Sequence, residues 1–114
     1  MSMDKYDIYC EEILSWALTI DIIYESDLVL AFYHTKPYYE KHLVVIPKEC
    51  ILDLYAIKVE NISLLQEIHK AVKICIATIW YTTFKTGVKV ITNHWKWQHT
   101  PHLHFHIVCG NKIW

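Results

Sequence analysis

The sequence lacks most features that mark a secreted, membrane-spanning or nucleic-acid-binding protein. Its four cysteines are widely spaced without a C-x-x-C pair, and no signal peptide precedes them, so we expect reduced thiols in a cytoplasmic protein. The longest apolar run, near residues 71–84, contains Lys73 and falls short of a membrane-spanning helix. Eleven basic residues balance twelve acidic ones without forming a basic block, so the sequence gives no indication of a polynucleotide partner.

What the sequence does contain is typical of one small globular domain. Of its 114 residues 54% are hydrophobic and five are Trp, which suffices for a core without disulfides. We find no internal repeat, low-complexity tract or linker, so residues 1–114 are predicted to form one α+β domain. Apolar periodicity predicts a short helix over Tyr6–Trp16 and a long helix over Val59–Thr82. Strands are predicted at residues 20–25, 28–34, 42–47, 88–92 and 102–108, with loops at 35–41 and 93–100.

The last predicted strand carries three histidines at strict period two, with apolar residues between and after them. They are His102, His104 and His106. Successive side chains of a strand point to opposite faces, so the three imidazoles share one face at spacings of about 7 Å. Imidazole suits proton transfer, attack on a phosphoryl group or metal ligation near neutral pH. The alternation by itself leaves these three uses open.

The segment His102-Leu-His-Phe-His-Ile-Val108 resembles the signature of the histidine-triad (HIT) nucleotide hydrolases and transferases. Two upstream blocks are also similar to that family: His42-Leu-Val-Val-Ile-Pro-Lys48 and Leu30-Ala-Phe-Tyr-His34. The Val-Ile-Pro-Lys strand and the terminal Trp114 are most similar to the histidine-triad nucleotide-binding branch. The resemblance implies a five-stranded antiparallel sheet with one long and one short helix, and a sheet that continues across a homodimer.

The resemblance also implies a role for each histidine of the triad. His104 is the nucleophile that forms a nucleotidyl-histidine intermediate, His106 binds the α-phosphate, and His102 supports the site. A nucleophilic imidazole must be neutral and held in one tautomer, so we expect a backbone carbonyl to accept from Nδ1 and leave Nε2 facing the phosphorus. An amine leaving group is protonated readily, so positioning and charge stabilisation supply most of the rate.

The loop before the triad departs from the family's glycine-rich pattern, because residues 93–100 contain no glycine. Asn93 and Gln98 match nucleotide-binding positions of the family. His99 stands at the usual Ser or Thr position, and Thr100 comes one place later. We therefore predict that His99 is a proton donor in place of the usual hydroxyl.

The nucleoside pocket shows a second departure. By alignment with the family, Ile8, Tyr9 and Phe32 form the apolar wall for the base, with simple packing of the first helix as the alternative for Tyr9. His34 stands where the family has an Asp that binds the ribose hydroxyls. A neutral imidazole accepts one hydrogen bond and cannot hold a vicinal diol with two oxygens. We expect a weaker or altered contact with ribose.

Some HIT relatives hold a structural zinc, and the matching positions here are Asp7, Cys10, Cys50 and His102. One carboxylate, two thiolates and one imidazole form a chemically suitable tetrahedral set. The alternative is that the cysteines are small buried hydrophobic residues.

These observations predict a cytoplasmic, homodimeric hydrolase of purine nucleoside 5′-phosphoramidates or related α-phosphate bonds. No cofactor is required for this chemistry, and zinc would be structural. One alternative is a dinucleoside polyphosphate hydrolase. The other is a dimeric nucleotide-binding module without turnover, which the glycine-free loop and His34 make plausible.

Overall fold

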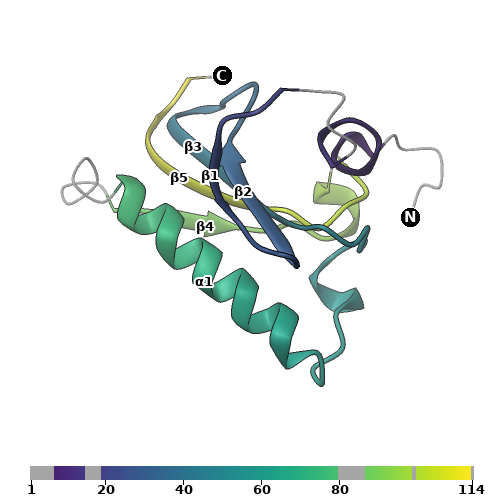
Figure 1. Ribbon diagram of the computed structural model, residues 1–114. Coiled ribbons are helices and arrows are strands. Elements are labelled where there is room, and N and C mark those ends of the chain that lie inside the picture. Colours follow the sequence, from purple (N-terminus) through teal and green to yellow (C-terminus); the bar gives the residue numbers. More distant parts are fainter. Residues whose placement is uncertain (1–6, 15–18, 80–86, 99, 114) are drawn as a thin grey trace.

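A five-stranded antiparallel sheet and one long helix form the framework of the protein (Figure 1). The computed structural model describes residues 7–14, 19–79, 87–98 and 100–113. The strands follow the sheet order β1-β2-β3-β5-β4 and are β1 (Ile22–Glu25), β2 (Val29–Tyr33), β3 (Tyr39–Pro47), β4 (Lys89–Ile91) and β5 (Phe105–Lys112). The helices are η1 (Tyr9–Ile13), η2 (Leu54–Ala56), α1 (Ile62–Ile79) and η4 (Trp95–Trp97). This arrangement confirms the predicted α+β fold with one long and one short helix.

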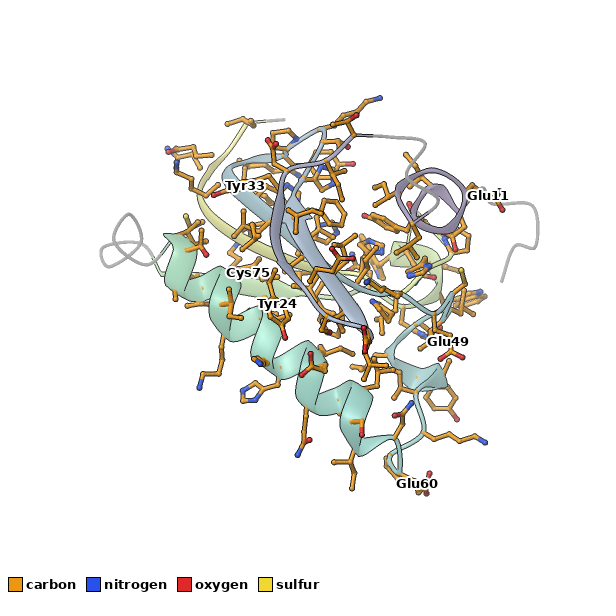
Figure 2. The ribbon with its side chains drawn as sticks, in the orientation of Figure 1. Glu11, Tyr24, Tyr33, Glu49, Glu60 and Cys75 are labelled. Carbon is orange, nitrogen blue, oxygen red and sulfur yellow. The ribbon has the colours of Figure 1, made fainter. Side chains whose placement is uncertain are left out.

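One face of the sheet packs against α1 (Figure 1). Buried side chains of the helix and of alternate strand positions form an apolar core there: Val29, Ala31, Leu43, Val45, Leu64, Ile68, Ala71, Cys75, Ile79, Leu103, Phe105, Ile107 and Cys109. Figure 2 shows Cys75 and Tyr24 between α1 and the strands. Each fully buried Leu, Ile or Phe contributes about 1.5–3 kcal/mol, so this layer provides most of the hydrophobic stabilisation.

The opposite face of the sheet carries a smaller apolar cluster beside η1. It consists of Tyr9, Ile13, Leu30, Phe32, Val44 and Ile46. Because strand side chains alternate between faces, Leu43 and Val45 lie under α1 while Val44 and Ile46 lie in this second cluster. Burial on both faces explains why the sequence of residues 43–46 is apolar without interruption.

The strand register gathers histidines from separate segments next to this cluster. Val44 pairs with His106 and His42 pairs with Val108, so His42 and His106 are diagonal neighbours on one face. Beyond the end of β2, the N–H of His34 donates to the carbonyl of His42 over 2.9 Å. Three histidines that are far apart in the sequence therefore share one surface of the sheet.

The structure corrects two strand predictions. β3 begins at Tyr39, so the predicted loop at 35–41 is wrong over its last three residues, which extend the strand beside β5. β5 begins at Phe105, so His102 and His104 precede the strand. The alternation of faces nevertheless continues through them, since Leu103 lies under α1 while both histidine rings contact Tyr9.

The long helix is shorter at its start than the periodicity predicts. Asn61 caps α1, because its Oδ1 accepts a hydrogen bond from the Leu64 N–H over 3.3 Å. Val59 lies before the helix and is 79% exposed, so its predicted place on the buried face is wrong. Residues 80–82, and Tyr6 and residues 15–16 of the predicted short helix, lie outside the described residues. None of the helices in the described ranges combines the length and hydropathy that a bilayer crossing requires.

Candidate active site

A pocket of about 550 Å³ opens on the histidine-bearing face of the sheet, beside η1. Its lining residues come from η1, the end of β2, the loop before β3 and the histidine segment: Ile8, Tyr9, Ile13, Phe32, His34, Thr35, Lys36, Tyr38, Asn93, Thr100, His104 and His106. Most of the residues predicted for catalysis and nucleotide binding thus lie around one cavity. A hollow of similar size beside η2 is lined by residues 49–52, 56–58 and 60–61 and contains no histidine, so it lacks comparable chemistry.

The backbone holds the ring of His104 in one tautomer. Its Nδ1 lies 2.7 Å from the carbonyl oxygen of His102. A carbonyl oxygen is an acceptor, so Nδ1 carries the proton and donates it, and the lone pair lies on Nε2. The Oγ1 of Thr92 donates to the carbonyl of His104 over 2.8 Å and positions the backbone of this residue. A neutral imidazole with its lone pair at a defined nitrogen is arranged as a nucleophile.

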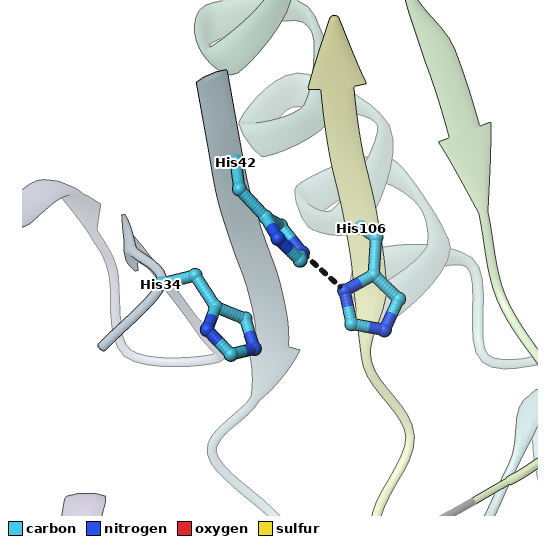
Figure 3. A group of neighbouring side chains, drawn as sticks. All are labelled: His34, His42 and His106. Atoms are coloured by element: carbon cyan, nitrogen blue, oxygen red, sulfur yellow. Dashed lines mark hydrogen bonds between the residues drawn. The ribbon is translucent and has the colours of Figure 1, made fainter. Parts of the chain in front are cut away.

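The opposite tautomer is imposed on His106 by a hydrogen-bond chain (Figure 3). The backbone N–H of Tyr38 donates to Nδ1 of His42 over 2.9 Å, so the proton of the neutral His42 ring lies on Nε2. Nε2 of His42 lies 2.7 Å from Nδ1 of His106 and donates to it, as the dashed line in Figure 3 shows. His106 therefore carries its own proton on Nε2. Its ring presents an N–H donor to the pocket, which suits an oxyanion.

His102 lies behind the pocket and does not line it. Its side chain is fully buried, with Nδ1 3.1 Å from Asp7 Oδ2 and Nε2 3.0 Å from the carbonyl oxygen of Pro47. Both neighbours are oxygen acceptors, so the ring connects the start of η1 to the end of β3. The other carboxylate oxygen of Asp7 accepts from the Tyr9 N–H over 3.0 Å. His102 thus contacts both segments behind the pocket. The supporting role that the resemblance implies for it stays a prediction.

Tyr9 forms the floor between the apolar cluster and the histidines. Its ring lies 5.1 Å from that of His104 and 6.3 Å from that of Phe32, centroid to centroid. Burial raises the pKa of the Tyr9 phenol well above its usual value, and the nearby Tyr38 and Asp7 add to this shift. The phenol therefore stays neutral in the physiological range. Tyr9 packs in the apolar cluster and also lines the pocket, and its contact with a base stays a prediction.

His34 extends the histidine group along the pocket wall (Figure 3). Its ring stacks on that of His42 with centroids 4.2 Å apart. Burial lowers the pKa of His34 to about 4, with a further contribution from His104. Burial also lowers the pKa of His42 to about 3, and His34 and His104 act in the same direction. Both rings are therefore neutral near pH 7, as the hydrogen-bond chain requires.

One predicted nucleotide-binding residue lies away from the pocket lining, one predicted catalytic residue lies outside the described residues, and one important residue was not predicted. Gln98 is buried away from the pocket lining, and its Nε2 donates to the carbonyl of Leu52 over 2.6 Å. His99 lies outside the described residues, so its predicted role stays a prediction. The residue that was not predicted is His42, which sets the tautomer of His106. The sequence analysis included it only as the first residue of an apolar strand. It could have been noticed as a polar residue at the start of that strand, which pairs antiparallel with the strand of the triad.

Two groups of side chains have the composition of metal sites. Asp7, Cys50 and His102 place ligand atoms within 4.8 Å of one another, and Nε2 of His102 is anchored on a carbonyl, which leaves Nδ1 toward the group. Cys75 and Cys109 are free thiols, as expected, whereas Cys50 is disulfide-bonded in this structure. The expectation of a reduced thiol is therefore wrong for Cys50, which in this form is not a thiolate ligand. The set therefore fits zinc once Cys50 is reduced. The side chain of Cys10, the fourth predicted ligand, lies outside the described residues, and zinc binding stays a prediction.

The second group, His34, His42 and His106, is less suited to a metal than its composition suggests. Its ligand atoms also lie within 4.8 Å of one another. However, backbone N–H groups donate to Nδ1 of both His34 and His42, so their Nε2 atoms carry protons instead of lone pairs. A metal at Nε2 would require both backbone hydrogen bonds to break. The group is better described as a set of N–H donors.

Comparison with known proteins agrees with the fold and the motif. The chain matches the HIT domain family over residues 18–113. It is 33% identical to an uncharacterized HIT-like protein of Rickettsia prowazekii over 112 residues, which cover 96% of this chain and 92% of that protein. A HIT family hydrolase from Clostridium thermocellum superposes with a TM-score of 0.78 at 28% identity, covering 100% of this chain and 96% of that one. A histidine triad protein from Clostridium difficile gives 0.76 at 30% identity, with 99% and 96% covered. The chain belongs to the HIT family.

Proposed function

We propose that the protein hydrolyses purine nucleoside 5′-phosphoramidates, or related bonds at the α-phosphate, through a nucleotidyl intermediate on His104. The observation that carries this proposal is the pair of opposite tautomers in one pocket. His104 has its lone pair on Nε2, whereas His106 has an N–H donor at Nε2. One ring can attack phosphorus while the other binds a phosphate oxygen. The name of the Clostridium thermocellum relative, a hydrolase, supports the same class of activity.

In the first step, Nε2 of His104 attacks the α-phosphorus, and the bond from phosphorus to the leaving nitrogen breaks. The leaving amine departs with the electron pair of that bond and takes up a proton. The carbonyl of His102 accepts from Nδ1 of His104 throughout, so it stabilises the positive charge that the ring acquires. The Nε2–H of His106 donates to a phosphate oxygen as negative charge develops there.

In the second step, a water molecule attacks the same phosphorus and the bond to Nε2 of His104 breaks. The water loses a proton, the nucleoside 5′-monophosphate leaves, and the neutral imidazole is restored with its lone pair on Nε2. Apolar residues of the pocket supply the face for the base, since Ile8, Phe32 and the ring of Tyr9 line the same cavity. Positioning by these groups supplies much of the rate.

The test is to trap the intermediate. The protein is mixed with a fluorogenic adenosine 5′-phosphoramidate, quenched within the first turnovers and measured by intact-protein mass spectrometry. We expect a mass increase of one adenylyl group that maps to His104 and is missing in His104→Ala. Turnover with the adduct on another residue would contradict the mechanism. If neither turnover nor an adduct is observed, the result favours a nucleotide-binding module without catalysis.

We also propose that two chains associate with the sheet continued between them. The sheet ends at β1 and β4, and β4 exposes Val90 by 47% at that edge. Light scattering coupled to size-exclusion chromatography tests this directly. A mass of twice the chain is expected at micromolar concentration, and the mass of one chain would contradict it.

A further inference from the structure

The ring of His34 is fixed as a hydrogen-bond donor toward the pocket. The backbone N–H of Lys36 donates to its Nδ1 over 2.9 Å, so the proton of the neutral ring lies on Nε2. Its ring centroid lies 5.9 Å from that of His106, and both rings line the same cavity (Figure 3). Two imidazole N–H donors are therefore available within one pocket, a short distance apart.

The residues next to His34 add further hydrogen-bond donors, so this part of the pocket favours a ligand group that accepts hydrogen bonds. Thr35 and Lys36 line the pocket beside it, and they provide a hydroxyl and an ammonium group. We call His34, Thr35 and Lys36 the donor corner. None of the described residues that line the pocket is an Asp or a Glu, so no carboxylate competes there for these donors. A ribose diol can donate two hydrogens, but the donor corner offers neither a carboxylate nor a free imidazole lone pair to accept them.

A phosphoryl group has the complementary chemistry. It carries negative charge and three acceptor oxygens, and hydrogen bonds between ionised partners are about twice as strong as neutral ones. The chain contains no arginine, so lysine and histidine are the basic side chains that can recognise phosphate. His34 and Lys36 of the donor corner are one of each, and both line the same cavity as His106.

We propose that the donor corner binds a second phosphoryl group of the nucleotide, beside the α-phosphate held by His104 and His106. This inference rests on the proposed function, because it names the substrate class of the same site. It is a phosphate ester on the 2′ or 3′ oxygen of the ribose, which lies on the nucleoside side of the α-phosphate. His34 and Lys36 line the same cavity as the apolar residues proposed for the base. Such a monoester carries close to two negative charges near neutral pH.

Binding of unreactive nucleotides to the intact protein tests the proposal. Isothermal titration calorimetry compares AMP with adenosine 2′,5′-bisphosphate, adenosine 3′,5′-bisphosphate and adenosine 5′-(α,β-methylene)diphosphate. We expect adenosine 2′,5′-bisphosphate or adenosine 3′,5′-bisphosphate to bind about tenfold more tightly than AMP at low salt, as a new charge-assisted contact does. The methylene diphosphate is the comparison, and an equal gain for it would overturn the ribose position. The bisphosphate that gains affinity identifies the esterified oxygen. The advantage should shrink as ionic strength rises.

Substitutions in the donor corner complete the test. His34→Asp and Lys36→Ala should each reduce the advantage of the second phosphoryl group, and His34→Asp should favour AMP. Lys73→Ala removes the same charge from the exposed side of α1 and is the matched control, which should keep the advantage. Circular dichroism verifies that each variant is folded.

The outcomes separate this inference from the proposed function. If AMP binds as tightly as both bisphosphates, the donor corner does not recognise phosphate on the ribose, and the hydrolase proposal stands. An advantage that survives in both His34→Asp and Lys36→Ala would also overturn the inference. If none of the four nucleotides binds, both proposals fail together.

Discussion

The two faces of residues 102–107 are built on the same backbone but solve different physical problems. The odd-numbered side chains lie in the apolar core under α1, whereas the even-numbered ones are the three histidines. Apolar side chains need close contact, and many arrangements of similar volume provide it. Buried imidazoles need a partner of the correct polarity for each nitrogen, because an unmade hydrogen bond costs about 1–3 kcal/mol.

In residues 102–107, the side chains on one face of the backbone contribute to stability, and those on the other face provide the chemistry. In the described part of the chain, every buried side-chain nitrogen and oxygen has a hydrogen-bond partner. On the histidine face these partners are mostly backbone groups, including the carbonyls of Pro47 and His102 and the N–H of Tyr38. The main chain therefore sets the tautomers. Substitutions on the helix face should change stability, and substitutions on the histidine face should change chemistry.

The sharpest test of this separation is His104→Ala. It should lower phosphoramidate hydrolysis by at least about 10³-fold, as the loss of a covalent nucleophile does. The free energy of unfolding should fall by no more than about 1–3 kcal/mol, since one buried hydrogen bond is lost. Steady-state kinetics and urea unfolding on the same preparation measure both quantities. Activity within tenfold of that of the original protein would contradict the assignment of chemistry to the histidine face.

On the helix face, Ile107→Ala should lower the free energy of unfolding by about 2–5 kcal/mol, because it opens a cavity in the core. Ile62→Ala is the matched control, because it removes the same side chain from the first turn of α1, where Ile62 is 60% exposed. Its loss should be about 1 kcal/mol or less. Urea titration of the two variants gives the difference. Equal losses would contradict the burial of Ile107 in the core under α1.

The histidine face should also make stability depend on pH. The pKa values of His34 and His42 are lowered by burial to about 4 and about 3 from the usual value of 6.5. The unfolded chain therefore binds more protons than the folded one below pH 6.5, and stability should fall as pH decreases from 6.5 toward 4. It should be nearly constant above pH 7 as far as these two groups are concerned.

Unfolding titrations at pH 7 and pH 5 measure this loss. His42→Gln should reduce the difference between the two pH values, because one of the neutral buried rings is removed. His69→Gln, at an exposed position of α1 away from the site, should leave the difference unchanged. An unaltered difference in His42→Gln would assign the pH dependence to other groups.

The smallest expected effect comes from Thr92→Val. This change removes the hydroxyl that donates to the carbonyl of His104, at a cost of about 0.5–1.5 kcal/mol. If that hydroxyl also positions the His104 backbone, kcat should fall by a few-fold while KM changes little. A stability loss with unchanged kcat would limit Thr92 to a structural role.

Much of the fold follows from the sequence because its patterns are local. β-Rich segments bounded by turns, one unbroken apolar segment and the period-two triad located all five strands, and the three- and four-residue spacing located α1. Boundaries were less accurate where the deciding contact is not apolar. Asn61 starts α1 by a capping hydrogen bond, and Tyr39 joins β3 through pairing with β5. Such contacts involve single polar groups or distant strands, which periodicity does not detect.

The family, the alternation of the triad and most of the residues around the pocket could be predicted from the amino-acid sequence. His34 could also be recognised there as a departure from the family. The roles open to these histidines depend on contacts that form when the chain folds. His42 reaches His106 across 64 positions of sequence, and Lys36 and Tyr38 orient rings through their backbone N–H groups. Which of the two ring nitrogens carries the proton depends on the atom that faces it, and that atom comes into place only when the chain folds.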